Sequence, residues 1–195
     1  MVFPLLLGVF LLLLALLVLV FELRILGYAY RKIGVPPRYM FIVMLVSLLG
    51  SQVNIPLFAM GHGRTVVAIN VGGALVPVLL SLYLFLRLRT LRTRMLVGTA
   101  IVAVIVHGLA TVVPGVGIAV PMLLPPLAAA AVSLALALRQ APPLAYVSGS
   151  MGALIGADLW NLPRIADIGA PVVSIGGAGT FDGVFLTGII AGLLA

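Results

Sequence analysis

Long apolar runs alternate along the chain with short segments in which the charged residues collect. Each run is close to the ~20 apolar residues that a helix needs to cross the hydrocarbon core of a bilayer. Inside that core every backbone polar group must be satisfied within the spanning element, which makes the helix the default structure. The pattern predicts an all-α, polytopic transmembrane helical bundle, forming a single domain over residues 1–195. We expect about seven spans, at residues 2–22, 39–58, 65–86, 95–113, 117–138, 143–162 and 172–195.

Composition supports this prediction and excludes other classes of protein. Hydrophobic residues make up 64% of the chain and charged residues only 8%, with a mean hydropathy of +1.36, whereas soluble domains carry about 25% charged residues. A net charge of +7 would suggest a nucleic-acid partner in a soluble protein. Here the basic residues fall in loops that orient the helices, so no nucleic acid is expected. The absence of cysteine excludes disulfides, thiolate catalysis and cysteine metal ligands.

Basic residues are divided unevenly between the two sides of the predicted bundle. The loops on one side carry most of them, and the other side has Arg64 and Arg164. Because lysine and arginine favour the cytoplasmic side, the N-terminus is predicted outside and the C-terminus in the cytoplasm. The first run has no basic segment before it and no cleavage site after it, so we expect a retained helix. The basic residues on the first side are Arg24, Arg31, Lys32, Arg38, Arg87, Arg89, Arg92, Arg94 and Arg139.

Prolines and glycines interrupt several of the predicted spans. The second, third and fifth spans contain proline, which kinks a helix and frees backbone carbonyls. The last span opens with residues 174–180, where three glycines in four positions predict a broken helix, with either unwound backbone or very close helix contact. Gly152 with Gly156, and Gly188 with Gly192, form pairs of small residues that let helices approach closely.

Polar side chains from five of the predicted spans fall at one depth. Helices rise 1.5 Å per residue, which puts these positions about 18–26 Å from the cytoplasmic face. They therefore share a layer in the outer half of the membrane. Ionisable groups are costly inside a bilayer, so the layer is where we expect the function. Its members are Asn54, Asn70, His107, Asp158 and Asp182.

Asp158 and Asp182 belong to consecutive, antiparallel spans, so their carboxyl groups can meet. Two carboxyls in a low dielectric share a proton near neutral pH, as in aspartic proteases and in proton-coupled transporters. A structural alternative stays open for each residue. Asp158 is in contact with water at the outer interface or pairs with Arg164, and Asp182 caps an internal helix. His107 has only a packing role. The histidine and both aspartates are an acceptable ligand set for a divalent ion. Because no spacing motif supports such a site, we predict no metal and no cofactor.

Four stretches resemble an uncharacterised prokaryotic membrane-protein family, number 1614 in the domain-of-unknown-function series. They are Asn54–Pro56, Ala145-Tyr146, Gly156–Leu159 and Ser174–Gly188. The likeness runs over nearly the whole chain. It implies a multi-pass protein of the prokaryotic cytoplasmic (inner) membrane and implies no activity.

A second, local resemblance is to presenilins and signal peptide peptidases, which are intramembrane aspartyl proteases. Gly179-Thr-Phe-Asp182 is similar to their G-x-G-D motif, and Asp158-Leu-Trp160 is similar to their first aspartate motif, one span earlier. This resemblance implies that the two aspartates form a catalytic dyad. The chain departs from those families in having phenylalanine for the second glycine, alanine before the first aspartate, and no P-A-L motif in a later span.

Three hypotheses for function follow. The leading one is an intramembrane aspartyl-protease-like hydrolase that acts on a transmembrane peptide, with Asp158 and Asp182 as catalytic residues. The second is a small proton-coupled transporter or carrier of a small solute, with the same aspartates as relay. The third is a non-catalytic scaffold that binds membrane lipids or another protein. Whether the chain forms an oligomer is left open by the sequence. The residues expected to hold a substrate are Gly176, Gly177, Gly179, Thr180, Asn54, Asn70 and His107.

Overall fold

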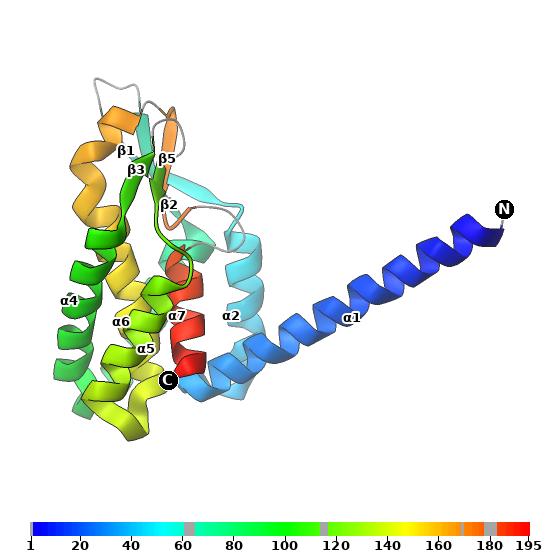
Figure 1. The fold of residues 1–195 in the computed structure, drawn as a ribbon, viewed down its shortest axis with the longest axis horizontal. Coiled ribbons are helices and arrows are strands. Elements are labelled where there is room, and N and C mark those ends of the chain that lie inside the picture. The colour runs from blue at the N-terminus through cyan, green and yellow to red at the C-terminus, as the bar shows by residue number, and fades with distance from the viewer. Residues whose placement is uncertain (1, 61–64, 114–116, 169, 178–182) are drawn as a thin grey trace.

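Helices gather into a bundle with strands at one end, and the first helix extends away from it (Figure 1). The structure is a computed structural model that describes residues 2–60, 65–113, 117–168, 170–177 and 183–195. The α-helices are α1 (Val2–Ile33), α2 (Pro37–Gly50), α3 (Val76–Arg87), α4 (Arg92–Leu109), α5 (Leu124–Ala137), α6 (Ala141–Ala153) and α7 (Gly183–Leu194).

Short turns of other helix types extend these elements. The 3₁₀ segments are η2 (Arg89–Leu91), η3 (Leu138–Gln140) and η5 (Leu159–Ile168). The π-helical turns are η1 (Val71–Leu75), which leads into α3, and η4 (Leu154–Asp158), which follows α6. Turns of the π type are rare and occur frequently at functional sites, so both mark positions of interest.

The fold is mostly helical, and several of its helices are apolar enough for a membrane, but seven full spans are not confirmed. Within the described ranges, the stretches long and apolar enough to cross a membrane are Phe10–Ile33, Arg89–Leu109 and Leu124–Arg164. Pro37–Gly50 has 14 residues, a length of roughly 21 Å at 1.5 Å per residue. That is short of the ~30 Å hydrocarbon core. Val71–Arg87 and Gly183–Leu194 are likewise shorter apolar helices.

Strands take the place of helix at one end of several predicted spans, which corrects the all-α prediction. One sheet has the order β1-β2-β5, with β1 and β2 antiparallel and β2 and β5 parallel. A separate antiparallel pair joins β3 to β4. The strands are β1 (Asn54–Met60), β2 (Thr65–Asn70), β3 (Thr111–Val113), β4 (Gly117–Ala119) and β5 (Val172–Ile175).

Local composition accounts for these strands. β2 contains Val66, Val67 and Ile69, and β-branched side chains favour an extended backbone that is packed on its faces. Pro56 lies in the edge strand β1, beside a register shift, where the missing N–H of proline is tolerated. The last predicted span is not helical at its start, because residues 172–175 form β5, and α7 begins at Gly183. Residues 178–180 of the predicted break lie outside the described residues.

Small residues bring the central helices together, as the paired glycines predicted. A Cβ added at Gly152 would lie 2.5 Å from Val102 Cγ1 of α4, and one at Gly156 would overlap a backbone carbonyl of the same helix. On α7, a Cβ at Gly188 would overlap Ser150 of α6, and one at Gly192 would lie 2.7 Å from Ile33 Cγ1 of α1. Larger side chains at these four positions would force the helices apart.

The basic connections lie together at the end of the bundle opposite the strands (Figure 1). Two of the basic side chains bind the last carbonyls of helices: Lys32 Nζ donates to Leu193 O of α7 at 2.7 Å, and Arg92 Nε donates to Phe85 O of α3 at 2.9 Å. Cations at helix C-termini satisfy free carbonyls and the helix dipole. The basic end is therefore a structural feature, while its assignment to the cytoplasm stays a prediction.

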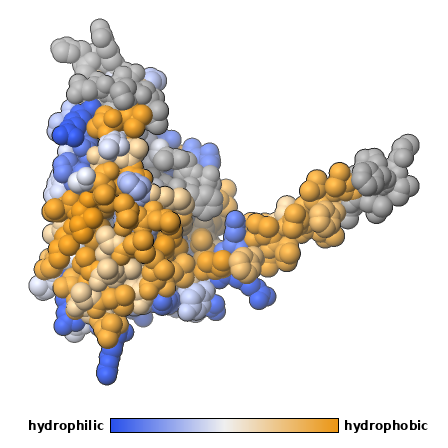
Figure 2. Space-filling view, in the orientation of Figure 1, coloured by the Kyte–Doolittle hydropathy of each residue, from blue (hydrophilic) through white to orange (hydrophobic). Residues whose placement is uncertain are grey.

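Apolar side chains cover the flank of the bundle and the projecting part of α1 (Figure 2). Along α1, exposed residues include Phe10, Leu17 and Phe21, each more than 60% exposed. The C-terminal end of α1 is different, because Tyr30 and Ile33 are fully buried against the other helices. Apolar patches of this extent require a nonpolar environment, which agrees with a membrane protein.

Candidate functional site

The side chain of Asn70 connects the sheet to the helical bundle through hydrogen bonds. Asn70 is the last residue of β2 and the N-cap of η1, where its Oδ1 accepts the N–H of Gly73 at 2.7 Å. Its Nδ2 donates to Ser51 O at 2.8 Å and to Asn54 Oδ1 at 3.0 Å. The side chain is 1% exposed. A buried amide with its donors and acceptor engaged fixes the local backbone, so these contacts are structural.

Asn54 joins three strands through its side-chain oxygen. In addition to the bond from Asn70, its Oδ1 accepts the hydroxyl of Ser174 in β5 at 2.6 Å. Asn54 and Asn70 are also direct partners in the register of β1 and β2. The two asparagines that the sequence placed at one depth are thus in contact. A role for them in holding substrate stays a prediction.

Asp158 lies where the regular helix α6 has ended, as the last residue of the π turn η4. Its Oδ2 accepts the backbone N–H of Gly176 at 2.8 Å. That bond connects η4 to the turn that follows β5, where Gly177 N donates to Ser174 O at 3.1 Å. The first predicted catalytic residue therefore contacts the glycine-rich segment that the sequence assigned to substrate binding.

Only glycine fits position 176. Its φ is +65°, which L side chains rarely adopt, and an added Cβ would lie 2.6 Å from Ala74 Cβ in η1. The left-handed conformation turns the N–H of Gly176 toward the carboxylate while the backbone passes close to η1. Both π turns consequently meet at this glycine, η4 through Asp158 and η1 through Ala74. We call this contact the Gly176 junction.

His107 lies in α4 beside η4 and is half-buried. Its Nδ1 is 3.3 Å from Gly156 O and 3.5 Å from Asn161 Nδ2, and its ring makes an edge contact with Trp160 at 5.3 Å between centroids. Asn161 itself donates to Gly156 O at 3.2 Å and to Ala157 O at 2.8 Å. These contacts hold the end of η4 against α4, which favours the packing interpretation of His107.

A cavity of about 370 Å³ opens beside Asp158, between α4, η4, α7 and the segment from β4 to the start of α5. We call it the Asp158 cavity. Asp158 and the buried Thr187 supply its polar side chains, and the rest of the lining is largely apolar. Its volume falls in the range of about 300–1,000 Å³ typical of sites for small molecules. The apolar lining includes Val106, Ile118, Met122, Pro125, Val184 and Leu186.

Three of the predicted site residues, Gly179, Thr180 and Asp182, lie outside the described residues. The Asp158–Asp182 dyad therefore stays a prediction. Gly183, which follows Asp182 directly in the sequence, lines the Asp158 cavity. Among the side chains that the structure describes, no three of histidine, cysteine, aspartate or glutamate gather as a metal site would require.

Sequence reasoning missed Asn161, Ser174 and Thr187. Asn161 follows Asp158 by three residues, a spacing that puts two side chains on one helix face and was available as a signal. Ser174 and Thr187 carried no such signal, because their contacts depend on sheet register and on helix packing.

One family model matches residues 30–194, and its description is "Protein of unknown function (DUF1614)". The chain belongs to this family. The match confirms the family resemblance drawn from the sequence, and it contains the Gly176 junction and the Asp158 cavity. No curated protein and no solved structure matched the chain. The resemblance to intramembrane aspartyl proteases thus has no support from these comparisons.

Proposed function

We propose that this protein is a membrane carrier that binds a small cationic solute with apolar groups in the Asp158 cavity. The observation that carries the proposal is a carboxylate at a helix discontinuity, lining a largely apolar cavity of about 370 Å³. A carboxylate in such surroundings attracts a cation, and the walls favour apolar groups on the same molecule. Thr187 adds a hydroxyl for a polar substituent.

Interrupted helices support transport rather than simple binding. Transporters place solute sites where helices are discontinuous, because freed backbone groups can bind solute there and the two halves can move. Here the regular helix α6 gives way to the π turn η4, which ends at Asp158, and residues 172–175 form the strand β5. In the proposed cycle Asp158 holds either a proton or the cation, so that solute binding releases one proton and a proton gradient drives exchange.

Binding to purified protein gives the first test. Trp160 is the one tryptophan of the chain and lies two residues after Asp158, so its fluorescence reports on η4. Titration with phenyltrimethylammonium, a permanent cation with an apolar ring, should give a saturable change. The Asp158→Asn variant should bind at least tenfold more weakly. Opposite unit charges about 5 Å apart at an effective dielectric of 20 attract by about 3 kcal/mol, or roughly 100-fold in Kd before desolvation is counted.

The control for this test is Glu22→Gln, which removes one carboxylate from the exposed part of α1. It should bind the cation as the unmodified protein does. Asparagine at position 158 keeps an oxygen that can accept the Gly176 N–H, so the Asp158→Asn variant is expected to fold. Equal affinity in the two variants, or no saturable binding to the unmodified protein, would contradict the proposal.

A second candidate, the aspartyl-protease-like hydrolase, is favoured by one observation. Gly183 lines the Asp158 cavity, and Asp182 is its neighbour in the sequence. The hydrolase predicts that purified protein cleaves a labelled transmembrane peptide and that Asp158→Asn and Asp182→Ala each abolish cleavage. Cleavage that continues in Asp182→Ala would eliminate this candidate and leave the carrier.

A further inference from the structure

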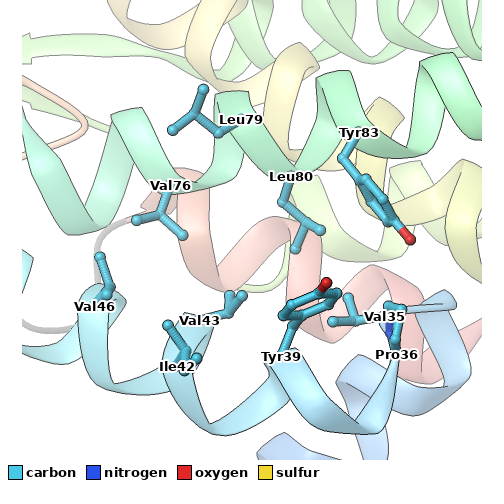
Figure 3. Close-up of a pocket in the computed structure, with 10 residues that line it drawn as sticks. All are labelled: Val35, Pro36, Tyr39, Ile42, Val43, Val46, Val76, Leu79, Leu80 and Tyr83. Carbon is cyan, nitrogen blue, oxygen red and sulfur yellow. The ribbon is translucent and has the colours of Figure 1, made fainter.

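A second cavity, of about 500 Å³, lies between α2 and α3, away from the proposed solute site. We call it the α2–α3 groove. Val46 and Val76 stand at one end of it, and Tyr39 and Tyr83 stand at the other, near Pro36 (Figure 3). The residues between these ends are aliphatic. The groove is therefore apolar along most of its length, with two phenol groups at one end only.

Positive charge is concentrated at the tyrosine end. The guanidinium of Arg38 lies 4.7 Å from the centroid of the Tyr39 ring, and that of Arg87 lies 5.8 Å from the centroid of the Tyr83 ring. The two arginines come from α2 and α3, one from each wall of the groove. Both are exposed, and neither forms an ion pair with a carboxylate of the described residues.

Arg87 is held in place but keeps donors for a ligand. Its Nη1 donates both to Gly34 O at 2.8 Å and to Tyr83 Oη at 2.9 Å. Within the described part of the chain, Nε and Nη2 have no partner. A guanidinium with a fixed orientation and two adjacent free donors matches the geometry of a phosphate. The stacking of Arg38 on Tyr39 orients a second cation at the same end of the groove.

We propose that the α2–α3 groove binds one anionic phospholipid, with an acyl chain along the aliphatic walls and the phosphate between Arg38 and Arg87. Tyrosine and arginine side chains at the end of an apolar surface commonly lie at the level of the lipid headgroups and contact them. Two guanidinium groups exceed the single charge of a phosphodiester and would repel an ammonium group. The site therefore favours a headgroup without an amine, such as phosphatidylglycerol, over phosphatidylcholine. This inference is independent of the proposed solute site.

Native mass spectrometry of the purified protein tests the site. Phosphatidylglycerol and phosphatidylcholine with identical acyl chains are added at equal concentration, and bound lipid is counted per protein. We expect one phosphatidylglycerol to bind at least tenfold more tightly than phosphatidylcholine. Arg38→Gln and Arg87→Gln should each reduce that preference to less than threefold. Arg94→Gln removes an exposed arginine of α4, a helix that contributes no residue to the groove lining, and should leave the preference unchanged.

A substitution that fills the groove tests whether its occupant is a lipid or something else. Leu79 lines the groove and is 55% exposed, so Leu79→Trp should block the acyl chain while the protein folds normally. The variant should lose tight phosphatidylglycerol binding, and millimolar inorganic phosphate should not displace the lipid from the unmodified protein. The proposal would be overturned if the two lipids bind equally, or if inorganic phosphate displaces the lipid completely. It would also be overturned if Leu79→Trp abolishes a dimer of the protein and leaves lipid binding unchanged.

Discussion

The Gly176 junction gives the most quantitative prediction, which concerns the variant Gly176→Ala. Alanine at a φ of +65° costs about 1–2 kcal/mol. The added methyl would also lie 2.6 Å from Ala74 Cβ and 2.7 Å from Ala74 N, and overpacking of this kind costs about 1–3 kcal/mol. If the turn shifts to relieve the crowding, the N–H bond to Asp158 at 2.8 Å is lost instead. Hydrogen bonds to charged groups contribute about 1.5–3 kcal/mol, so either response gives a similar loss.

We therefore expect Gly176→Ala to lower the free energy of unfolding by about 2–5 kcal/mol. Denaturation of the purified protein by SDS in mixed micelles, followed by the fluorescence of Trp160, measures this change. Two glycines provide matched controls. Gly34 has a φ of +101° and open space around its Cβ position, and Gly108, which lies in α4, has open space there as well.

The controls separate conformational strain from crowding. Gly34→Ala should lose only conformational strain, because no atom lies within 4 Å of its Cβ position. Gly108→Ala should be neutral or gain up to about 1 kcal/mol, because alanine favours the helix over glycine. The reasoning is refuted if Gly176→Ala loses no more than the strain of about 1–2 kcal/mol expected at its own φ, since crowding against η1 and the bond to Asp158 would then contribute nothing.

Two further variants test the contacts around the cavity, with stability measured in the same way. Asn70→Ala leaves buried partners at Ser51 O and Gly73 N unsatisfied and should cost about 2–4 kcal/mol; a loss below about 0.5 kcal/mol would mean that water replaces the amide. His107→Ala should cost about 1–2 kcal/mol, because it removes the contacts with Gly156 and Trp160. The same variant should bind phenyltrimethylammonium within twofold of the unmodified protein, and a larger change would place His107 in the solute site.

The sequence predicted the helical bundle because hydropathy over some twenty residues is a strong signal for apolar helices. It did not predict where each helix stops. Val66, Val67 and Ile69 favour strand, yet they lie in an apolar run that average hydropathy cannot distinguish from helix. The pairing of β2 with β5 joins segments about a hundred residues apart, and no local pattern fixes such a register.

The polar layer was partly predictable for a physical reason. Asn70 caps η1, and helical turns run from there to Arg87, so the asparagine lies at the opposite end of this helix from the basic residues, as the sequence predicted; its depth in a membrane stays a prediction. The contact between Asn54 and Asn70 follows from a hairpin register that the sequence did not reveal. Likewise, the bond from Gly176 to Asp158 depends on a π turn and on one left-handed glycine. Neither can be deduced from residue spacing.

The central claim, that Asp158 is the cation site of a carrier, is tested most directly by solute flux. Purified protein is reconstituted into proteoliposomes with an acidic interior, and uptake of radiolabelled phenyltrimethylammonium is followed. We expect uptake in exchange for protons that stops when nigericin dissipates the pH gradient. Uptake should fall at least tenfold in Asp158→Asn and should be unchanged in Glu22→Gln. The claim would be contradicted if uptake does not depend on the pH gradient and if Asp158→Asn takes up the cation as fast as Glu22→Gln.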